Sequence, residues 1–398
     1  MRKLGEGATS EVFLCQDPFR NRQVAVKRIF PESLRDPSRG RLFRKLFFTE
    51  ASLAGKLDHP HIAQIYDAGI GEDSGYIVME FVPGGTMERF CAPDNLLPVD
   101  QTVEIVFKCA RALAYAHMQG VTHRDIKPGN ILYAAEPTDV RIGDFGLALN
   151  LGAETTQITG VGSPAYMSPE QIREDAVDHR TDLYSLGVVM YQMLTGRLPF
   201  QGSNKFSMIY QITQHDPAPP SSMRPQVPET LDRIVRRAMQ KDAKGRYHSG
   251  DEFAEDLVQA LRAGLGGGRR ETFGDADKFA ALRAMRFFAR FAEPELWELV
   301  RIGVWERVST GTDMMREGEP GDFFCVLVEG EARVTKNRKL LSVLGPGECF
   351  GEMAYLALDR RERGATVTAA KDAHVLRVRI TDLEQASLTC RSHIDRAF

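Results

Sequence analysis

The sequence has few cysteines, and none of them stand in a pattern that builds a zinc site or a disulfide framework. The six cysteines are scattered and include no Cys-x-x-Cys pair. The first residues, Met1-Arg2-Lys3-Leu4, do not resemble a secretory leader. We therefore expect reduced thiols in a cytoplasmic protein.

Long apolar runs and an excess of charge of one sign are also missing. The most apolar stretch, about Leu183 to Leu194, is too short to cross a bilayer, so it predicts a core helix and no membrane span. The 51 Lys and Arg residues nearly balance the 54 Asp and Glu residues. This balance gives no general attraction to nucleic acid, and we expect no nucleic-acid partner.

The length of 398 residues predicts two domains, and the composition is that of an ordinary globular protein. A glycine-rich stretch predicts a linker over residues 263–274, between domains at 1–262 and 275–398. After the linker we expect helix from about Asp275 to Val308. Short strands follow, separated by turns at Gly311, Gly318, Gly321, Gly330, Gly345, Gly347, Gly351 and Gly364.

The first domain opens with a glycine-rich loop, Gly5-Glu6-Gly7-Ala8-Thr9-Ser10-Glu11-Val12, in which backbone amides can approach a phosphate closely. Lys27 follows on an apolar strand, and Glu50 lies on a helix expected over about 41–57. Each signal alone has an ordinary alternative: a hairpin turn, a solvated lysine and a solvated glutamate.

Two further motifs decide between these alternatives: His123-Arg124-Asp125-Ile126-Lys127-Pro128-Gly129-Asn130, and Asp144-Phe145-Gly146. With them the first domain resembles the eukaryotic-type protein kinases, because five ordered motifs agree at kinase-like spacing. The resemblance implies an α+β, bilobal kinase fold. Lys127, two residues after Asp125, is typical of serine/threonine kinases and differs from tyrosine kinases. The segment from Pro217 to Leu261 is similar to the bacterial Hanks-type kinases in particular.

The resemblance also implies roles for individual residues. Asp125, Lys127, Lys27 and Glu50 would be catalytic, with Asp125 orienting the substrate hydroxyl and Lys27 pairing with Glu50. Asn130 and Asp144 would hold Mg²⁺ or Mn²⁺. The ATP-binding residues would be Leu4, Gly5, Gly7, Val12, Ala25, Lys27, Met79, Glu80, Val82, Asn130 and Asp144.

The resemblance has three further implications. Glu170 would pair with Arg246, and Asp182 would brace the backbone of the catalytic loop. Thr86 and Gly129 occupy two positions where kinases that select arginine often carry acids, which argues against a strong preference for arginine-flanked sites.

The segment from Asp144 to Glu170 matches the kinase activation segment. Its Thr155, Thr156 and Thr159 would be phosphorylated by the chain itself and would pair with Arg124, since a phosphate adds about two negative charges. For any one of the three, an ordinary polar loop residue is an equal alternative.

Residues 275–398 resemble cyclic-nucleotide-binding domains, which implies a β-roll with flanking helices. The similarity rests on Gly318-Glu319-Pro320-Gly321-Asp322, Phe350-Gly351-Glu352-Met353-Ala354 and Arg363-Gly364-Ala365-Thr366-Val367. By this resemblance Gly351, Glu352, Met353, Ala354, Arg363, Gly364 and Ala365 would bind cAMP or cGMP. Asp359 and Glu362 leave two outcomes open: Arg360 or Arg361 neutralises them and Arg363 is free, or Arg363 is itself paired.

The sequence thus predicts a kinase for protein Ser and Thr hydroxyls, using Mg-ATP, with a C-terminal module that biases its activity on binding a cyclic nucleotide. Two alternatives stay open. The module can be ligand-free and mediate protein interaction or dimerisation, or both domains can serve as a non-catalytic scaffold. The oligomeric state is not fixed by the sequence.

Overall fold

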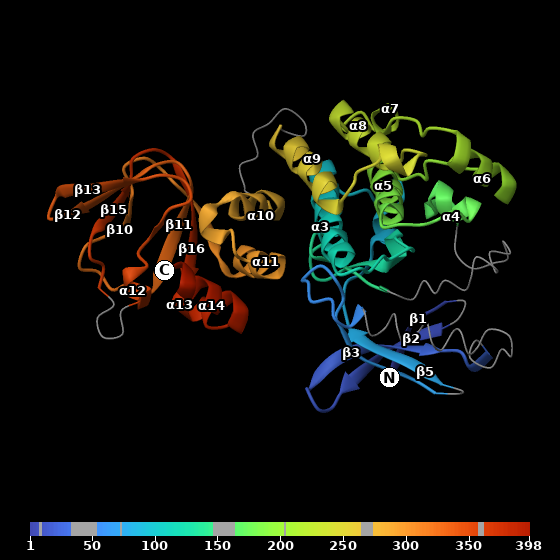
Figure 1. Ribbon diagram of the computed structural model, residues 1–398, viewed down its shortest axis with the longest axis horizontal. Helices are drawn as coiled ribbons and strands as arrows, with labels where there is room; N and C mark the ends of the chain where they lie inside the picture. The colour runs from blue at the N-terminus through green and yellow to red at the C-terminus, as the bar shows by residue number, and fades with distance from the viewer. Residues whose placement is uncertain are drawn as a thin grey trace. The chain divides into compact units, whose positions relative to one another are not determined.

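A computed structural model describes residues 1–7, 10–32, 54–71, 74–145, 164–202, 204–263, 274–356 and 362–398 (Figure 1). Contacts along the backbone divide the chain into two units, Met1–Arg270 and Glu271–Phe398. No helix within these described ranges is long and apolar enough to cross a bilayer.

The first unit begins with an antiparallel sheet of five strands in the order β1-β2-β3-β5-β4. The strands are β1 Arg2–Glu6, β2 Ser10–Asp17, β3 Arg22–Ile29, β4 Ile65–Ile70 and β5 Gly75–Glu80. Side chains alternate between the two faces of a strand, so Lys27 shares a face of β3 with Ala25 and Ile29. Both neighbours belong to the apolar core of this sheet. The stem of Lys27 therefore lies against the core, and the side chain is only 12% exposed.

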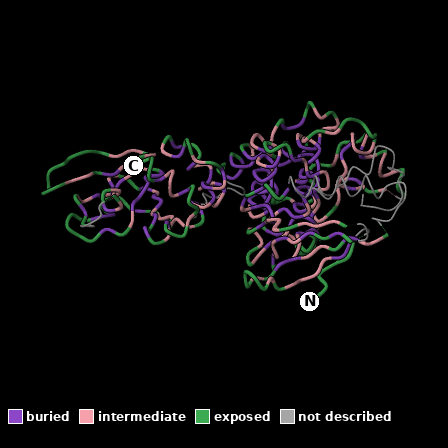
Figure 2. Tube along the Cα trace, turned by 60° about the horizontal axis from the view of Figure 1, so that its bottom comes forward, coloured by how far each residue is buried: buried purple, intermediate pink, exposed green. Residues whose placement is uncertain are grey.

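A helical region follows the sheet and is built around two buried helices, α3 Val99–Met118 and α5 Arg180–Thr195. The other helices are α4 Pro169–Arg173, α6 Lys205–Gln214, α7 Pro220–Met223, α8 Glu229–Ala238 and α9 Gly250–Arg262. Figure 1 shows α9 beside α3. Residues Leu183–Leu194 are buried except Gln192, which confirms the predicted core helix. Figure 2 shows buried segments gathered inside the unit that carries the N-terminus.

Short 3-10 turns and strands lie between the longer elements of this unit and carry several of the motifs seen in the sequence. They are the 3-10 turns η1 Met87–Phe90, η2 Pro128–Asn130, η3 Pro164–Tyr166 and η4 Ala243–Gly245, and the strands β6 Gly85–Thr86, β7 Ile131–Tyr133 and β8 Val140–Ile142. The three strands form one small sheet in the order β6-β7-β8. Pairing of β7 with β8 brings the residues before β7 close to those after β8.

The second unit contains two antiparallel sheets of four strands each, as the predicted β-roll requires. One sheet has the order β10-β15-β12-β13, with β10 Asp313–Met315, β12 Ala332–Lys336, β13 Lys339–Leu344 and β15 Thr366–Ala369. The other has the order β14-β11-β16-β9, with β9 Val304–Val308, β11 Phe323–Glu329, β14 Cys349–Phe350 and β16 Ala373–Arg379. Met315 and Val367 of the first sheet share one buried cluster with Leu327 and Val375 of the second.

Helices flank the two sheets: α10 Asp275–Ala284, the turn η5 Arg286–Phe288, α11 Glu293–Ile302, α12 Met353–Leu356, α13 Ile380–Leu383 and α14 Leu388–Ala397. The predicted helix from 275 to 308 was wrong at its end, because residues 304–308 form β9. Gly303 follows the helix so tightly that a Cβ there would lie 2.1 Å from Leu376 Cδ1. Beyond it, Val304 to Val308 pair with β16, and this pairing suits β-branched and aromatic residues.

Candidate active site and ligand-binding site

The loop between α3 and β7 presents Asp125, whose side chain is 46% exposed. Its Oδ2 accepts hydrogen bonds from Lys127 Nζ at 2.6 Å and from Asn130 Nδ2 at 3.0 Å. Asn130 Nδ2 also donates to the Asp125 carbonyl at 2.7 Å, which ties the two ends of the loop together. The carboxylate is thus held in one orientation while part of it faces solvent.

Asp182 on α5 holds the backbone of this loop, as predicted. Its buried carboxylate accepts hydrogen bonds from the backbone amides of His123 at 2.8 Å and Arg124 at 2.7 Å. His117 Nε2 lies 2.8 Å from the same carboxylate. Burial opposes ionisation, but the hydrogen bonds and the charge of His117 outweigh it and lower the pKa of Asp182. The ionised carboxylate therefore fixes the unusual backbone of Arg124, whose φ is +66°.

Asp144 follows β8 and meets both the sheet and the catalytic loop. Lys27 Nζ lies 3.1 Å from Asp144 Oδ2. The amide of Gly143 donates to the Asn130 carbonyl at 2.8 Å, so Asp144 and Asn130 are neighbours in space. Glu50, the predicted partner of Lys27, lies outside the described residues.

The donor atoms of Asn130 and Asp144 fit a small divalent cation. Asn130 uses its Nδ2 within the loop, which leaves its side-chain carbonyl oxygen to act as a ligand, and Asp144 adds a carboxylate. Mg²⁺ prefers such oxygens and keeps several waters or phosphate oxygens in its shell. No group of three or more acidic, histidine or cysteine side chains that could hold a metal occurs among the described residues, so phosphate and water would have to complete the shell.

The predicted adenine pocket lies where the sheet passes into the helical region. Ala25, Met79 and Val82 are buried at 7%, 8% and 8% exposure. In the described part of the chain, neither the amide nor the carbonyl of Val82 has a backbone hydrogen-bond partner. The Glu80 carboxylate is occupied by Arg141 Nε at 2.8 Å, so only its backbone could meet a base.

The glycine loop and the outer strands would close this pocket from above. The amide of Gly7 donates to the Ser10 carbonyl at 2.8 Å, which makes a tight turn at the loop. Leu4 is 40% exposed, and Gly5 pairs with Val12 across β1 and β2. Residues 8 and 9 lie outside the described residues.

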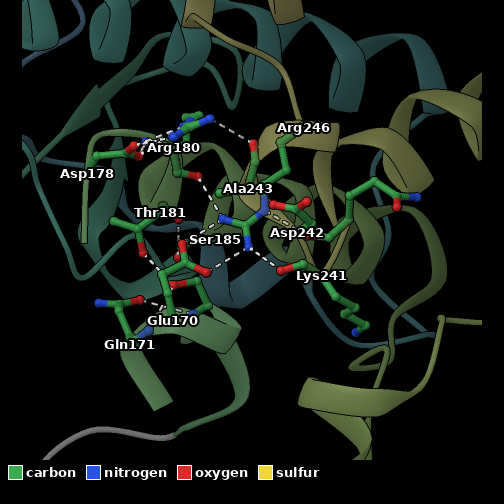
Figure 3. Close-up of polar contacts among 12 residues, drawn as sticks. Glu170, Gln171, Asp178, Arg180, Thr181, Ser185, Lys241, Asp242, Ala243 and Arg246 are labelled. Atoms are coloured by element: carbon green, nitrogen blue, oxygen red, sulfur yellow. Dashed lines mark hydrogen bonds and ion pairs between the residues drawn. The ribbon is translucent and has the colours of Figure 1, made fainter. Parts of the chain in front are cut away.

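Glu170 at the start of α4 forms the predicted ion pair with Arg246, which follows η4. Arg246 Nη1 and Nη2 donate to the two carboxylate oxygens at 2.6 and 2.7 Å (Figure 3). Arg246 Nε donates to the Gln240 carbonyl at 2.7 Å, and its side chain is fully buried. Burial opposes ionisation of Glu170, but the hydrogen bonds and charge of Arg246 outweigh it and lower its pKa.

Replacing Glu170 by glutamine is expected to lower the free energy of unfolding by about 2 kcal/mol at pH 7, the usual size for a hydrogen bond to a charged group. The pKa of Glu170 is lowered from 4.5 on folding, so its contribution is present above that pH and is lost as the pH falls further. The difference between the two proteins should therefore shrink in acid. Urea unfolding at pH 7 and pH 4 measures it, with exposed Glu229→Gln as control; a constant difference would contradict the assignment.

In the second unit, Arg363 is 5% exposed and lies between the turn before β11 and the start of α12. Its Nη1 donates to the Gly351 carbonyl at 3.1 Å, and its guanidinium lies over the Phe323 ring, 4.3 Å from the centroid. Its Nη2 is buried and has no partner among the described residues. Burial lowers the pKa of Arg363, so the cation is held where an anion would stabilise it.

Glu362, one of the two acids expected to compete for Arg363, forms no ion pair with it in the described part of the chain. Glu362 is exposed and makes no ion pair within the described residues, whereas Asp359, Arg360 and Arg361 lie outside them. Gly321 and Gly351 come so close to the guanidinium that a Cβ at either would lie 2.9 Å or less from it. These glycines leave the space that Arg363 fills.

The other predicted ligand residues lie along the chain on either side of Gly351 and Arg363. Glu352 precedes α12, Met353 is 65% exposed at its start, and Ala354 is buried beside Gly321. Gly364 and Ala365 follow Arg363 and lead into β15. The structure therefore gathers the predicted residues at one edge of the roll.

Comparison with known proteins agrees with this geometry. Residues 1–259 match the family model described as the protein kinase domain, which is more than half of the chain. The chain belongs to the protein kinase family. In addition, residues 305–389 match the model for the cyclic nucleotide-binding domain.

The relatives of the kinase domain include bacterial serine/threonine kinases. Over 317 residues the chain is 38% identical to the serine/threonine-protein kinase PknB of Mycobacterium leprae, covering 78% of this chain and 50% of the relative. It is 39% identical over 264 residues to PknB of Mycobacterium tuberculosis, covering 64% and 41%. The chain thus spans about half the length of the curated relatives it matches, or less.

Solved structures share the kinase fold. A crystal structure of the PknI kinase domain of Mycobacterium tuberculosis is 28% identical with a TM-score of 0.53, covering 66% of this chain and 94% of that one. Rad53 1-466, solved in complex with AMP-PNP, has the same identity and TM-score, covering 64% and 63%.

Two features of the kinase site were not anticipated from the sequence. Lys127 pairs directly with Asp125, and the carboxylate of Glu88 lies beside Gly129 in the catalytic loop. The second feature has one sequence signal, a glycine at position 129 that leaves room for a neighbour. The predicted phosphorylation sites Thr155, Thr156 and Thr159 lie outside the described residues.

Proposed function

We propose that this chain transfers the γ-phosphate of ATP to serine and threonine hydroxyls of proteins, and that its C-terminal unit biases this activity on binding cAMP or cGMP. The observation that carries the first part is the set of contacts Lys27–Asp144, Asn130–Asp125 and Lys127–Asp125, at 3.1, 3.0 and 2.6 Å. The backbone hydrogen bond from Gly143 to Asn130 brings the first contact next to the other two. It brings two ammonium groups and two carboxylates to one site. Such a site suits phosphoryl transfer, where catalysis is mainly positioning and charge stabilisation.

Each residue has a part in the proposed reaction. Asp125 accepts a hydrogen bond from the substrate hydroxyl and receives its proton as the oxygen attacks the γ-phosphorus. Lys127, already beside that carboxylate, stabilises the charge on the transferred phosphoryl group. Lys27 binds the α- and β-phosphates. Asn130 and Asp144 would hold Mg²⁺ or Mn²⁺, and the bound cation would neutralise phosphate charge.

Phosphorylation of the chain's own activation segment is part of the proposal. Arg124 Nε is buried without a partner among the described residues, in the loop that holds Asp125. A phosphate on Thr155, Thr156 or Thr159 would offer oxygens to this guanidinium. Unchanged activity after replacing all three threonines by alanine would remove this part.

The second part of the proposal rests on the unpaired, buried Nη2 of Arg363. A cyclic phosphate is a single compact anion, and a guanidinium can bind it through two nitrogens. Regulation then requires that the nucleotide bind the active and inactive kinase states with different affinity. The sign of that difference is not fixed by the site.

The proposal is tested by measuring ³²P transfer from ATP to a general protein substrate by the full chain, with and without cAMP or cGMP. We expect transfer that requires Mg²⁺ or Mn²⁺ and disappears in Lys27→Met, and a rate that changes with one of the nucleotides. Absence of transfer under all conditions would favour the scaffold alternative. Transfer that neither nucleotide affects would leave the kinase and remove the regulation.

One observation favours the alternative in which the second unit mediates association. The edge strand β13 exposes Leu340 and Leu341 at 59% each and Val343 at 48%. An unpaired edge with apolar side chains can pair with another chain. Ligand-independent dimers that dissociate in Leu341→Lys would support this second candidate.

A further inference from the structure

Glu88 lies in η1, and its carboxylate reaches the catalytic loop. A Cβ at Gly129 would lie 2.8 Å from Glu88 Oε1 and 3.3 Å from its Cδ. Any side chain at position 129 would therefore displace this carboxylate. The Glu88 carboxylate thus fills the space that a side chain at position 129 would take.

The side chain of Glu88 is exposed to solvent. Within the described residues it makes no ion pair and no side-chain hydrogen bond. Two cations close to it in sequence or in the catalytic loop have other partners: Lys127 Nζ donates to Asp125 at 2.6 Å, and Arg89 Nη1 donates to the Tyr133 hydroxyl at 3.3 Å. Among the described residues, no ion-pair partner of Glu88 would compete with a basic group from a bound protein.

The charge of Glu88 also acts on the segment that leads into α4. Burial raises the pKa of Tyr166, and the negative charge of Glu88 contributes to the same direction. Tyr166 belongs to η3, and its hydroxyl donates to Gln192 Oε1 at 2.6 Å. The exposed carboxylate of Glu88 beside Gly129 marks a surface next to the catalytic loop.

This surface lies within reach of a bound protein substrate. Gly129 precedes Asn130, whose Nδ2 is 3.0 Å from Asp125 Oδ2. An extended chain advances about 3.3–3.6 Å per residue, so a side chain a few positions from the phosphorylated hydroxyl can reach Glu88. Arginine and lysine are long enough to place their charge on the carboxylate while the hydroxyl stays at Asp125.

We propose that Glu88 selects protein substrates that carry arginine or lysine within about four residues of the phosphorylated serine or threonine. The inference rests on the proposed phosphotransfer and adds a substrate preference to it. Thr86 and Gly129, the two positions where such kinases often carry acids, have no carboxylate in this chain. The acid comes instead from position 88, and Gly129 makes room for it.

The size of the expected substrate preference follows from the solvent exposure of the Glu88 side chain. An exposed ion pair changes binding by up to about fivefold, because water screens it. We therefore expect a moderate preference in kcat/KM at one or two peptide positions, not an absolute requirement.

The experiment compares peptides that hold one serine in a neutral sequence, with a single arginine, glutamine or glutamate at each position from −5 to +5. In the parent chain the arginine peptide should be preferred by about fivefold in kcat/KM at one position. The ratio should fall to about one in Glu88→Gln, and Glu88→Lys should prefer a glutamate at that position. Asp94→Asn, which removes an exposed acid six residues away, should keep the parent ratio.

Each result decides the inference. An active parent chain with equal rates for all peptide pairs, or a preference that persists in Glu88→Gln, would overturn it and leave the phosphotransfer intact. A parent chain that phosphorylates no peptide and no protein would overturn the proposed function and this inference with it. Gly129→Ala gives an independent check, because displacing the Glu88 carboxylate should also reduce the ratio.

Discussion

Replacing Asp125 by asparagine is expected to reduce kcat for phosphate transfer by about 10²- to 10⁴-fold, the usual contribution of a positioned general base. Asparagine keeps the size of the side chain and can still accept from Asn130. It cannot receive the proton of the substrate hydroxyl, and it no longer pairs with the charge of Lys127, 2.6 Å away. Substrate binding should change much less than turnover.

Steady-state ³²P transfer with saturating Mg-ATP measures this effect, and thermal unfolding shows that the variant is folded. Asp139→Asn is the matched control. Asp139 is a half-exposed acid whose Oδ1 lies 3.1 Å from Arg141 Nη1, and within the described residues no hydrogen bond or ion pair joins it to Asp125. The control should retain parental kcat. Transfer by Asp125→Asn at more than a tenth of the parental rate would contradict the role given to this carboxylate.

The arrangement of the catalytic loop could be anticipated because its residues act on their near neighbours. Asp125, Lys127 and Asn130 are five positions apart at most, so their spacing alone limits how they can meet. Asp182 was placed under the loop only through the family resemblance. The structure supplies the physical reason, which is two backbone amides that need a buried acceptor.

Contacts between distant segments that no motif marks were not predictable in the same way. Glu88 and Gly129 are separated by the whole of α3, and an exposed glutamate carries no signal of its own in a sequence. The helix expected up to residue 308 ends at Ile302 for a related reason. Whether Val304–Val308 becomes helix or strand depends on β16, which lies about seventy residues further along the chain.

Arg363 illustrates the limit of a motif in the second unit. The sequence places an arginine before Gly364 and Ala365 but does not reveal what surrounds its guanidinium. In the structure, Phe323 supports one face of the guanidinium, and Arg377 lies 4.4 Å from the centroid of the same ring. The positive charges of Arg363 and Arg377 repel each other, and nearby anions offset this repulsion. Arg377 already has such an anion, Glu306 at 2.8 Å, so an added anion would act on Arg363.

Arg363→Ala is therefore expected to weaken binding of cAMP or cGMP by about 100-fold or more, because removing one partner of a buried charge pair has effects of that order. The parent chain should bind one of the two nucleotides with micromolar or higher affinity. Arg363→Lys should recover only part of the loss, since an ammonium cannot bind the phosphate through two nitrogens. Calorimetric titration of the full chain measures all three affinities.

Arg379→Ala is the matched control, because Arg379 is an exposed arginine at the end of β16, two residues after Arg377. It should bind as the parent chain does. Equal affinity in Arg363→Ala would mean that the guanidinium does not meet the phosphate. If the parent chain binds neither nucleotide, the unpaired Nη2 of Arg363 does not serve cyclic-nucleotide binding. The exposed edge of β13 would then become the stronger explanation for keeping a β-roll beside a kinase domain, and kinase activity should follow the oligomeric state of the chain in place of the nucleotide concentration.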